Sequence, residues 1–455
     1  MKKTKIMSLA LAAALGASML TGCGTGSGGI KKVTVWSGNS HSKVVVSRLV
    51  DEFNKDKGKK LGVKIDYIVK EGDSASSIDL AYDTGDEPEF CSTGNIKKLA
   101  EDGKIVALED LPGGAELLAE YDENDYKNFQ TDGKTYKIPY GATTQGLIYN
   151  KDMFKKYGIV DENGEAKPPE TLEEMREDAK IMTNEAEHEY GIVIPLSNEW
   201  LYNVEVMSLA KASCNFREFD WEKGEFDYTS HTPVLELYAG IKQDNSYFPG
   251  ADNMDNDTAR AQFAQGKIGM KIGASYDVGV LNDQFPAKCD WGVAPYPTAV
   301  KGERYKTELA SNGFLVINKK AVDNLGAETA MEIFNFFHDD AMMTELYKEG
   351  MEIPCKNTIV ENTKIDNPKK GWTDFAALVN SSTVIRWDVP GAASTGAKTG
   401  NDYFLQDLWT GKMTPAEITA AMTKERNESM RQWFEKNTDK NQQDYIMPNY
   451  STRME

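Results

Sequence analysis

Hydrophobic and polar positions alternate along several short stretches of this chain, while longer stretches between them repeat apolar residues every three or four positions. Residues 33–36 and 63–69 alternate with a period of two, which predicts half-buried β-strands. Residues 42–54 place Val45, Leu49 and Phe53 on one face of a helix. Strands that alternate with helices favour βαβ units and a mainly parallel sheet. The pattern therefore predicts an α/β protein.

The stretch 134–159 repeats this pattern in a compact form. Alternation over 136–138 predicts a strand, which we expect Pro139-Tyr140-Gly141 to end. The apolar, β-prone run 146–149 predicts a buried strand, and 151–157 predicts a helix that stops at the following glycine. We interpret this stretch as the place where the chain first passes from one structural half to another.

Two capping boxes mark helix starts elsewhere in the chain. Thr171-Leu172-Glu173-Glu174 predicts a helix to about residue 182, and Thr414-Pro415-Ala416-Glu417 predicts a long helix to about residue 434. Further strands are predicted at 88–91, 191–195, 266–273, 291–296 and 314–317. Further helices are predicted at 74–82, 96–101, 198–212, 232–244, 257–265, 325–337 and 341–348.

Length and charge narrow the class of protein. The chain has 455 residues, and single hydrophobic cores usually stop growing at about 250–300 residues, so two domains are expected. Charged residues make up 27% and hydrophobic residues 40%, which is typical of a soluble globular body. The formal net charge of −19 repels nucleic acid at long range, so no nucleic-acid partner is expected.

The N-terminus has the pattern of an export signal. Lys2, Lys3 and Lys5 precede an apolar run over 6–20 that is too short for a comfortable membrane span. The run ends in Leu20-Thr21-Gly22-Cys23, which resembles the bacterial lipobox. This resemblance implies a signal peptide over 1–22, lipidation at Cys23, and a lipidated, flexible tether over 23–30. The alternative is a plain secretory peptide with a chance cysteine.

The remaining cysteines and motifs point away from metal and cofactor chemistry. Cys91, Cys214, Cys289 and Cys355 are far apart and form no C-x-x-C pair. Three full disulfide pairings stay open, but we expect buried free thiols, because a core of this size needs no covalent support. The sequence contains no H-E-x-x-H, phosphate loop or G-x-S-x-G, so no catalytic residue, metal or cofactor is expected.

Several segments, in one order along the chain, resemble the extracellular solute-binding proteins of bacterial ABC importers. The resemblance is to the sugar-binding family that includes maltodextrin-binding protein. Besides the lipobox and the opening strand and helix, it rests on 85–90, 136–139, 147–154, 169–174, 263–270, 292–297 and 411–417. Glu89 stands where the family usually has an aspartate.

This resemblance implies two α/β lobes, each a mixed sheet flanked by helices, with the ligand in a cleft between them. The first lobe would take 31–143 plus 312–372, and the second 144–311 plus 373–455. It implies no catalysis. It also implies lobe closure, in which we expect Gly141 to Gly146 to absorb the rotation. The expected partners are a carbohydrate, the ABC permease and the membrane that holds the lipid anchor, and the expected state is a monomer.

A sugar site needs aromatic platforms beside amides, carboxylates and arginine. Arg386-Trp387-Asp388 combines a bidentate donor, a ring and an acceptor in one loop. The other candidates are rings or hydrogen-bonding residues near strand ends, helix starts or loops: Trp36, Asn39, Asp83, Thr93, Tyr140, Trp200, Trp221, Tyr276, Asn312 and Trp372. Core packing is the alternative for the rings, and capping or turn formation for the small polar residues.

The sequence therefore predicts a lipid-anchored receptor that captures a carbohydrate, an oligosaccharide in particular, outside the cytoplasm and delivers it to an ABC permease. A peptide, a polyamine or another solute remains open as the ligand. A secreted glycan hydrolase is also open, since a pair among the 71 acidic residues would suffice for its chemistry.

Overall fold

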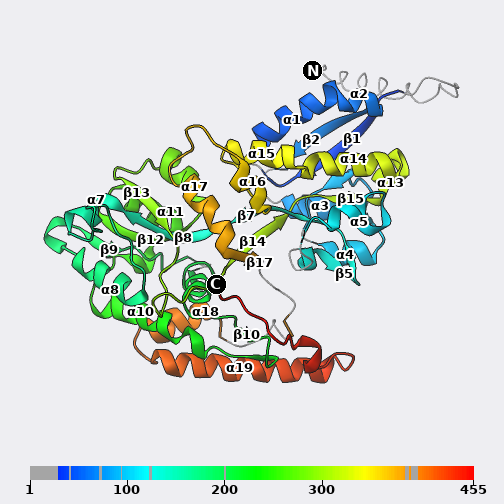
Figure 1. Ribbon diagram of the computed structural model, residues 1–455. Helices are drawn as coiled ribbons and strands as arrows, with labels where there is room; N and C mark the ends of the chain where they lie inside the picture. The colour runs from blue at the N-terminus through cyan, green and yellow to red at the C-terminus, as the bar shows by residue number, and fades with distance from the viewer. Residues whose placement is uncertain are drawn as a thin grey trace, which may run out of the picture.

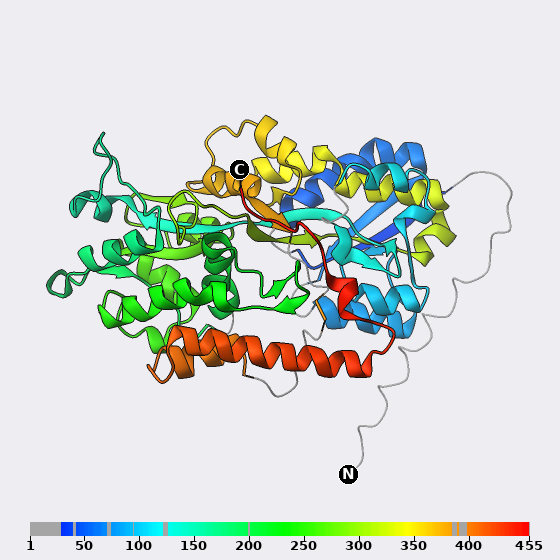
Figure 2. The ribbon, with the colours of Figure 1, turned by 60° about the horizontal axis from the view of Figure 1, so that its bottom comes forward.

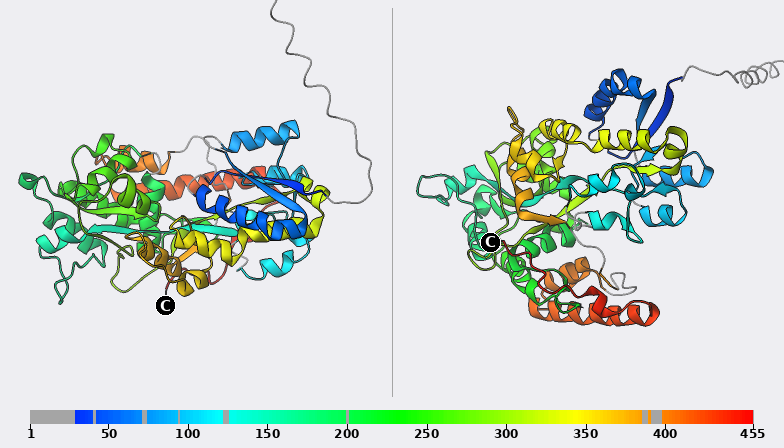
Figure 3. Two further views of the ribbon diagram at one scale, coloured as in Figure 1. Left: turned by 90° about the horizontal axis from the view of Figure 1, so that it is seen from above. Right: turned by 45° about the vertical axis from the view of Figure 1, so that its right-hand side comes forward.

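The computed structural model describes residues 29–39, 42–70, 74–93, 95–121, 126–198, 201–384, 389–390 and 398–454. These residues form two α/β lobes with a small sheet between them (Figure 1). Figure 3 shows the same lobes from two other directions, with the chain crossing between them. The mixed, two-lobed α/β architecture predicted from the resemblance is confirmed.

The first lobe is built on a five-stranded sheet in the order β2-β1-β3-β15-β4. β1 (Lys31–Ser37) pairs in parallel with β2 (Val63–Val69) and β3 (Phe90–Cys91). β15 (Val316–Asn318) runs antiparallel to β3 and to β4 (Ile105–Val106). Four of the five strands therefore run in one direction, as the prediction of a mainly parallel sheet requires, and β15 is the exception because the chain re-enters this lobe in the opposite direction.

Helices cover both faces of this first sheet. One core cluster joins Val33 and Val35 of β1 to α1 (Lys43–Lys55), α14 (Ala327–His338) and α15 (Asp340–Lys348). A second cluster lies on the other face and contains residues of α3 (Ser74–Thr84) and α4 (Ile96–Glu101). Buried alternate residues of β1 therefore face helices, as its period of two predicts.

The second lobe is built on the sheet β13-β8-β12-β9. Its strands are β13 (Trp291–Ala294), β8 (Gln145–Asn150), β12 (Ile268–Ala274) and β9 (Tyr190–Ile192). All seven residues of β12 are buried, so helices cover both faces of the sheet. These helices include α7 (Lys151–Lys156), α8 (Leu172–Ile181), α10 (Thr232–Gln243) and α11 (Asn256–Ala264), and α19 (Pro415–Lys436) packs on α10. Figures 1 and 2 show α19 along one side of this lobe.

A third sheet, β16-β7-β14-β17, lies where the chain crosses between the lobes. Its strands are β16 (Ile353–Pro354), β7 (Pro139–Thr143), β14 (Thr307–Gly313) and β17 (Ser382–Val384). β7 runs into β8 with Thr144 between them, and β14 runs into β15 after two residues. The two central strands of this crossing sheet therefore continue into the sheets of opposite lobes.

The stretch Pro139-Tyr140-Gly141 does not break a strand, and that expectation is wrong. It begins β7, where Pro139 pairs with Gly313 and Gly141 with Asn312. Proline is compatible with the first position of a strand, where its missing N–H is tolerated. The pairing partners lie about 170 residues away, so local alternation carries no sign of them.

Other element boundaries also differ from expectation. The expected helix over 198–212 is a π-helix over Tyr202–Met207 that continues as α9 (Ser208–Cys214). The expected helix 325–337 is α14, separated from α13 (Lys319–Leu325) by Gly326 at φ 85°. The helix starts predicted at Thr171 and Thr414 are confirmed, since each threonine side chain accepts a backbone N–H of the first turn.

Three further observations concern the described residues as a whole. None of their helices has the length and apolar run needed to cross a bilayer. None of the cysteines at 91, 214, 289 and 355 forms a disulfide, and Cys91 is the one that is buried while the other three are half-buried. Within the same part of the chain, no three acidic, histidine or cysteine side chains gather as metal ligands.

Candidate functional site

The parallel strands β2, β1 and β3 end at one edge of the first-lobe sheet, which we call the first-lobe edge. In open α/β sheets, ligands bind beyond the carboxyl ends of the strands. The loops that leave β1 and β3 are joined there, because Gly38 N–H donates to Ser92 Oγ at 2.8 Å and Ser92 N–H to Trp36 O at 3.0 Å. Asn39 N–H donates to Ser37 Oγ at 3.0 Å.

Trp36 brings an aromatic ring to the first-lobe edge. It is half-buried, and the ammonium nitrogen of Lys70 lies 3.6 Å from its ring centroid. This is a close cation–π contact. The indole Nε1 is buried and has no hydrogen-bond partner among the described residues. Trp36 therefore presents a ring and an unsatisfied donor at the place where a ligand is expected.

Thr93 and Lys137 lie on the β3 side of the same edge. Both are buried, and the Lys137 ammonium donates to the Thr93 carbonyl oxygen. The Thr93 hydroxyl accepts the N–H of Asn95 at 3.1 Å, so it acts partly as a turn residue. Burial lowers the pKa of Lys137 to about 8. Of the other first-lobe candidates, Asn39 follows β1 and is half-buried, whereas Asp83 is exposed near the end of α3, away from this edge.

The second-lobe sheet presents Tyr276 at the carboxyl end of β12. Tyr276 is 45% exposed and directly precedes the short helix α12 (Asp277–Gly279), where the sequence predicted a helix start. The neighbouring Ser275 N–H donates to Thr144 O at 2.9 Å, which ties this strand end to the crossing between β7 and β8. Tyr276 thus has an accessible ring beside the crossing.

A buried charged network lies under Tyr276. Asp277 is fully buried; its Oδ1 accepts Arg260 Nε–H at 2.5 Å and its Oδ2 accepts Ala274 N–H at 2.8 Å. The Arg260 guanidinium carbon lies 5.1 Å from the Tyr276 ring centroid. Lys271 Nζ is 3.9 Å from Asp277 Oδ2. This network fixes both the backbone and the ring at the strand end.

Sequence reasoning missed this network. Its one visible signal was Lys271, a charged residue inside the otherwise apolar run of β12. Glu205, in the preceding π-helix, is also buried, and burial raises its pKa to about 8. The nearby charges of Lys271 and Arg260 oppose that rise.

Three candidate rings lie in the core in this structure. Tyr140 is 3% exposed and its ring centroid is 4.6 Å from that of Phe314. Trp372 is 4% exposed and its Nε1 donates to the carbonyl oxygen of Tyr347 at 3.0 Å. Trp221 is also buried. Because protein atoms surround the rings of Tyr140 and Trp372, their contact with a ligand stays a prediction that requires rearrangement, and a ligand role for Trp221 stays a prediction as well.

Several candidates cannot be placed. Cys23, Trp200 and the trio Arg386, Trp387 and Asp388 lie outside the described residues. Asn312 is placed by its backbone alone, which pairs with Gly141 in the crossing sheet. Their roles remain predictions.

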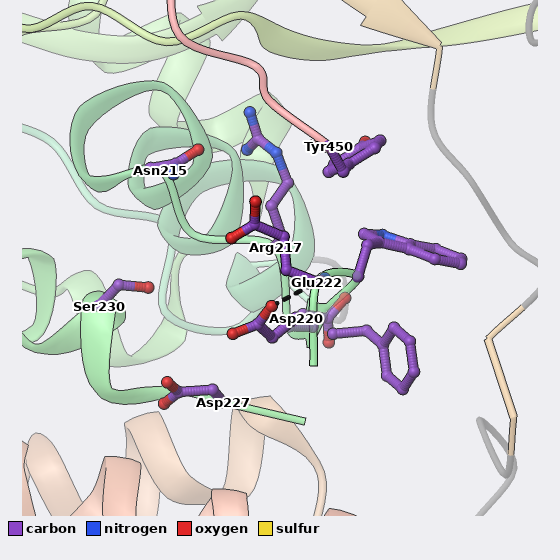
Figure 4. A pocket seen from close by; sticks show the side chains of 10 residues that line it. Asn215, Arg217, Asp220, Glu222, Asp227, Ser230 and Tyr450 are labelled. Carbon is purple, nitrogen blue, oxygen red and sulfur yellow. Dashed lines mark hydrogen bonds between the residues drawn. The ribbon is translucent and has the colours of Figure 1, made fainter. Parts of the chain in front are cut away.

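A hollow of about 220 Å³ opens beside Trp221 in the second lobe (Figure 4). Its lining combines aromatic and charged side chains: Asn215, Arg217, Glu218, Phe219, Asp220, Trp221, Glu222, Asp227, Ser230 and Tyr450. Glu218 accepts the Tyr228 hydroxyl at 2.9 Å, and Asp227 accepts the Thr229 hydroxyl at 2.6 Å. Several of its charged groups therefore already have protein partners, which distinguishes it from the first-lobe edge.

The C-terminal segment closes one side of this hollow. Arg217 donates to the Lys306 carbonyl at 3.1 Å and also bonds the Thr452 hydroxyl. Thr452 Oγ1 donates to Asn215 Oδ1 at 2.8 Å, and Met447 N–H donates to Trp221 O at 2.6 Å. These contacts dock the tail on the second lobe.

Known proteins match this chain along most of its length. A family model for bacterial extracellular solute-binding proteins matches residues 48–373. A putative binding protein of Brucella abortus is 25% identical over 300 residues, which are 63% of this chain and 66% of that protein. The match thus spans just under two thirds of that relative. The sn-glycerol-3-phosphate-binding periplasmic protein UgpB of Pectobacterium atrosepticum is 22% identical over 426 residues, 86% of this chain and 89% of the relative.

Solved structures share the fold. A cyclo/maltodextrin-binding protein complexed with maltotetraose aligns with a TM-score of 0.64 at 17% identity, over 88% of this chain and 97% of its own. At this identity the likeness establishes the two-lobed fold. The family model, by contrast, covers well over half of the 455 residues. The chain therefore belongs to the bacterial extracellular solute-binding proteins.

Proposed function

We propose that this protein is the lipid-anchored binding component of an ABC importer, which captures a carbohydrate, an oligosaccharide in particular, between its lobes and delivers it to the membrane permease. The protein acts as a monomer without catalysis. The lobes close about the crossing sheet. The first lobe takes about 31–143 plus 312–372, and the second about 144–311 plus 373–455.

The observation that carries this proposal is the pair of aromatic residues at the ends of the two lobe sheets. Trp36 lies at the first-lobe edge, and Tyr276 lies at the end of β12 beside the crossing. Each ring is accompanied by charged or hydrogen-bonding groups, namely Lys70 for Trp36 and Arg260 for Tyr276. Apolar sugar faces stack on such rings while their hydroxyls bond the polar neighbours.

The relatives support the ligand class. The structural neighbour holds maltotetraose, and UgpB is named for sn-glycerol-3-phosphate. Both names describe binding of polyhydroxylated molecules. The family is one of binding proteins, which supports a receptor over a hydrolase.

Calorimetric titration of the mature protein with neutral and charged mono- and oligosaccharides tests the ligand class. We expect saturable binding of at least one carbohydrate, weakened about 10-fold or more by Trp36→Ala or Tyr276→Ala, since an aromatic ring that stacks on a ligand contributes on the order of 1–3 kcal/mol when that ligand is a nucleic-acid base. Trp433→Ala, on the half-buried side of α19, is the matched control and should bind normally. Binding of a peptide or a polyamine without binding of any carbohydrate would show that the ligand is not a sugar. Formation of a cleaved glycan product would indicate a hydrolase.

The anchor has its own test. Cells that express the full chain should incorporate labelled fatty acid into the protein and retain it in the membrane fraction. Cys23→Ala should abolish both the label and the retention. Unchanged labelling in this variant would place the lipid elsewhere.

A further inference from the structure

We infer that the carbohydrate carries an acidic group, a carboxylate or a phosphate, and that Lys70 and Lys137 bind this group at the first-lobe edge. The inference rests on the proposed function, because it assigns a ligand class to the same cleft. It depends on the placement of two ammonium groups, each without a carboxylate partner among the described residues.

Lys137 is the more buried of the two. It is 5% exposed, and its ammonium has one acceptor among the described residues, the Thr93 carbonyl oxygen. An ammonium carries three N–H donors. A buried charge is costly unless it is paired and hydrogen-bonded, so two donors of Lys137 still require acceptors.

Lys70 lies on the other side of the same edge. It directly follows β2, and its N–H donates to Ser37 O at 2.8 Å, at the end of β1. Its ammonium rests over the Trp36 ring at 3.6 Å from the centroid. Ser37 is therefore flanked by Lys70 from β2 and by the Thr93 turn, to which Lys137 is bound, from β3.

No carboxylate in the described part of the chain neutralises either lysine. Many described lysines of this acidic chain form ion pairs, but neither Lys70 nor Lys137 has a carboxylate oxygen of a described residue within the 4.0 Å that defines one. Asp79 acts on Cys91 of β3, and Glu352 is a second acidic side chain whose field reaches this edge, where it acts on Tyr67 and Tyr140. It forms no ion pair with either ammonium.

Apart from the hydroxyls of Ser42 and Tyr67, which can donate or accept, the unsatisfied groups at this edge are donors. Besides the two ammonium groups, the buried Trp36 Nε1–H lacks a partner among the described residues. A sugar hydroxyl would satisfy one such donor, but it would leave both positive charges uncompensated. An anionic oxygen satisfies donors and charge together, and charge-assisted hydrogen bonds are about twice as strong as neutral ones. The chemistry of the edge thus selects an oxyanion on the ligand.

Calorimetric titration with matched ligands tests this inference. One arm uses uronic-acid oligosaccharides against their carboxyl-reduced, neutral counterparts. The other uses sugar phosphates against the free sugars, so that the two arms distinguish a carboxylate from a phosphate. We expect at least 10-fold tighter binding of the acidic member of one pair, and weaker binding at higher salt.

Variants locate the effect. Lys137→Met and Lys70→Met should each weaken binding of the acidic ligand by 10-fold or more and weaken binding of the neutral ligand much less. Lys137→Arg should retain the preference because it keeps the charge. Lys60→Met is the control, since Lys60 lies on α2 (Lys57–Leu61), which precedes β2, with its side chain 72% exposed. Thermal unfolding of Lys137→Met, which keeps the side-chain length, verifies that it folds.

Two different results would overturn the inference. Neutral sugars that bind as tightly as their acidic counterparts, together with acidic-ligand binding that Lys70→Met and Lys137→Met leave unchanged, would refute the acidic ligand and leave the carbohydrate receptor intact. Failure of every sugar, neutral or acidic, to bind the wild-type protein would refute the proposed function and this inference with it.

Discussion

Arg260 and Asp277 form a buried ion pair under the accessible ring of Tyr276. The Arg260 Nε–H donates to Asp277 Oδ1 at 2.5 Å, and the two side chains are 13% and 1% exposed. The pair joins α11 to the end of β12, because Asp277 also accepts the Ala274 N–H. The position of the Tyr276 ring at the end of β12 therefore depends on the buried charge of Asp277.

Arg260→Met should destabilise the protein strongly. The substitution leaves the Asp277 carboxylate buried without its main partner, which typically costs about 3–5 kcal/mol. Urea unfolding measures the loss. Arg48→Met is the control, because Arg48 is 44% exposed and its ion pairs lie at the surface, where each contributes about 0–1 kcal/mol. A loss below about 1 kcal/mol for Arg260→Met would show that Lys271 alone compensates Asp277.

Glu205 should make stability fall as the pH rises. Burial raises its pKa to about 8, above its ordinary value of 4.5, so the folded protein holds a proton that the unfolded chain has released. The stabilisation that the protonated Glu205 gives the folded protein is fully present below about pH 4.5 and is lost as the pH rises through about 8. The slope from one such group is at most about 1.4 kcal/mol per pH unit.

Glu205→Gln tests that assignment. We measure the unfolding free energies of wild type and variant between pH 4.5 and 8. The gap between the two values should change across this range, because the stability of wild type falls as the pH rises while that of the variant does not respond to this group. The difference isolates Glu205 from Asp178, whose pKa is also raised by burial, to about 7. Parallel pH profiles for the two proteins would mean that Glu205 titrates normally.

The two glycines of the first crossing should respond differently to alanine. A Cβ at Gly146 would lie 2.7 Å from the Ala294 carbonyl oxygen, which belongs to a neighbouring strand and cannot move freely. A Cβ at Gly141 would lie 2.3 Å from Glu352 Oε2, the end of a flexible side chain. Gly146→Ala should cost about 1–3 kcal/mol and Gly141→Ala less than about 1 kcal/mol.

The same pair tests whether this crossing is the hinge. If the lobes rotate about residues 141–146, Gly146→Ala should also reduce the compaction seen by small-angle scattering when a ligand is added. Full compaction in Gly146→Ala, despite its lower stability, would place the hinge elsewhere in the crossing sheet.

Thr452→Val should loosen the C-terminal segment. The Thr452 hydroxyl donates to Asn215 Oδ1 and accepts from Arg217, and its loss leaves both partners without this bond. We expect a loss of about 1–2 kcal/mol in unfolding free energy and faster hydrogen exchange over residues 447–454. Thr358→Val is the control because Thr358 is exposed on α16 (Asn357–Asn362). Unchanged exchange would show that the other backbone bonds hold the tail.

The sequence predicted those parts of the fold that depend on neighbours along the chain. The Thr414–Glu417 capping box starts α19 at Pro415, because both of its hydrogen bonds form within four residues. The alternation of β1 is equally local, and it reports which face is buried. Such features need no knowledge of the rest of the molecule.

Features made by distant pairing could not be predicted. Pro139-Tyr140-Gly141 has the composition of a turn, yet it is a strand because β14 and β16 lie on either side of it. Likewise, the ring of Tyr140 stacks on that of Phe314. The two residues are far apart along the chain, so no local pattern predicts this contact. Of the candidate site, Trp36 and Tyr276 lie at strand ends as expected, whereas the partners of Lys137 and Asp277 became visible only in three dimensions.

The crossing sheet also has a thermodynamic consequence. β7 and β14 pair with each other, while their continuations β8 and β15 belong to the sheets of different lobes. Melting either lobe would remove strand partners from the sheet that both share. Heat should therefore unfold the two lobes together, as one calorimetric transition whose measured and van't Hoff enthalpies agree.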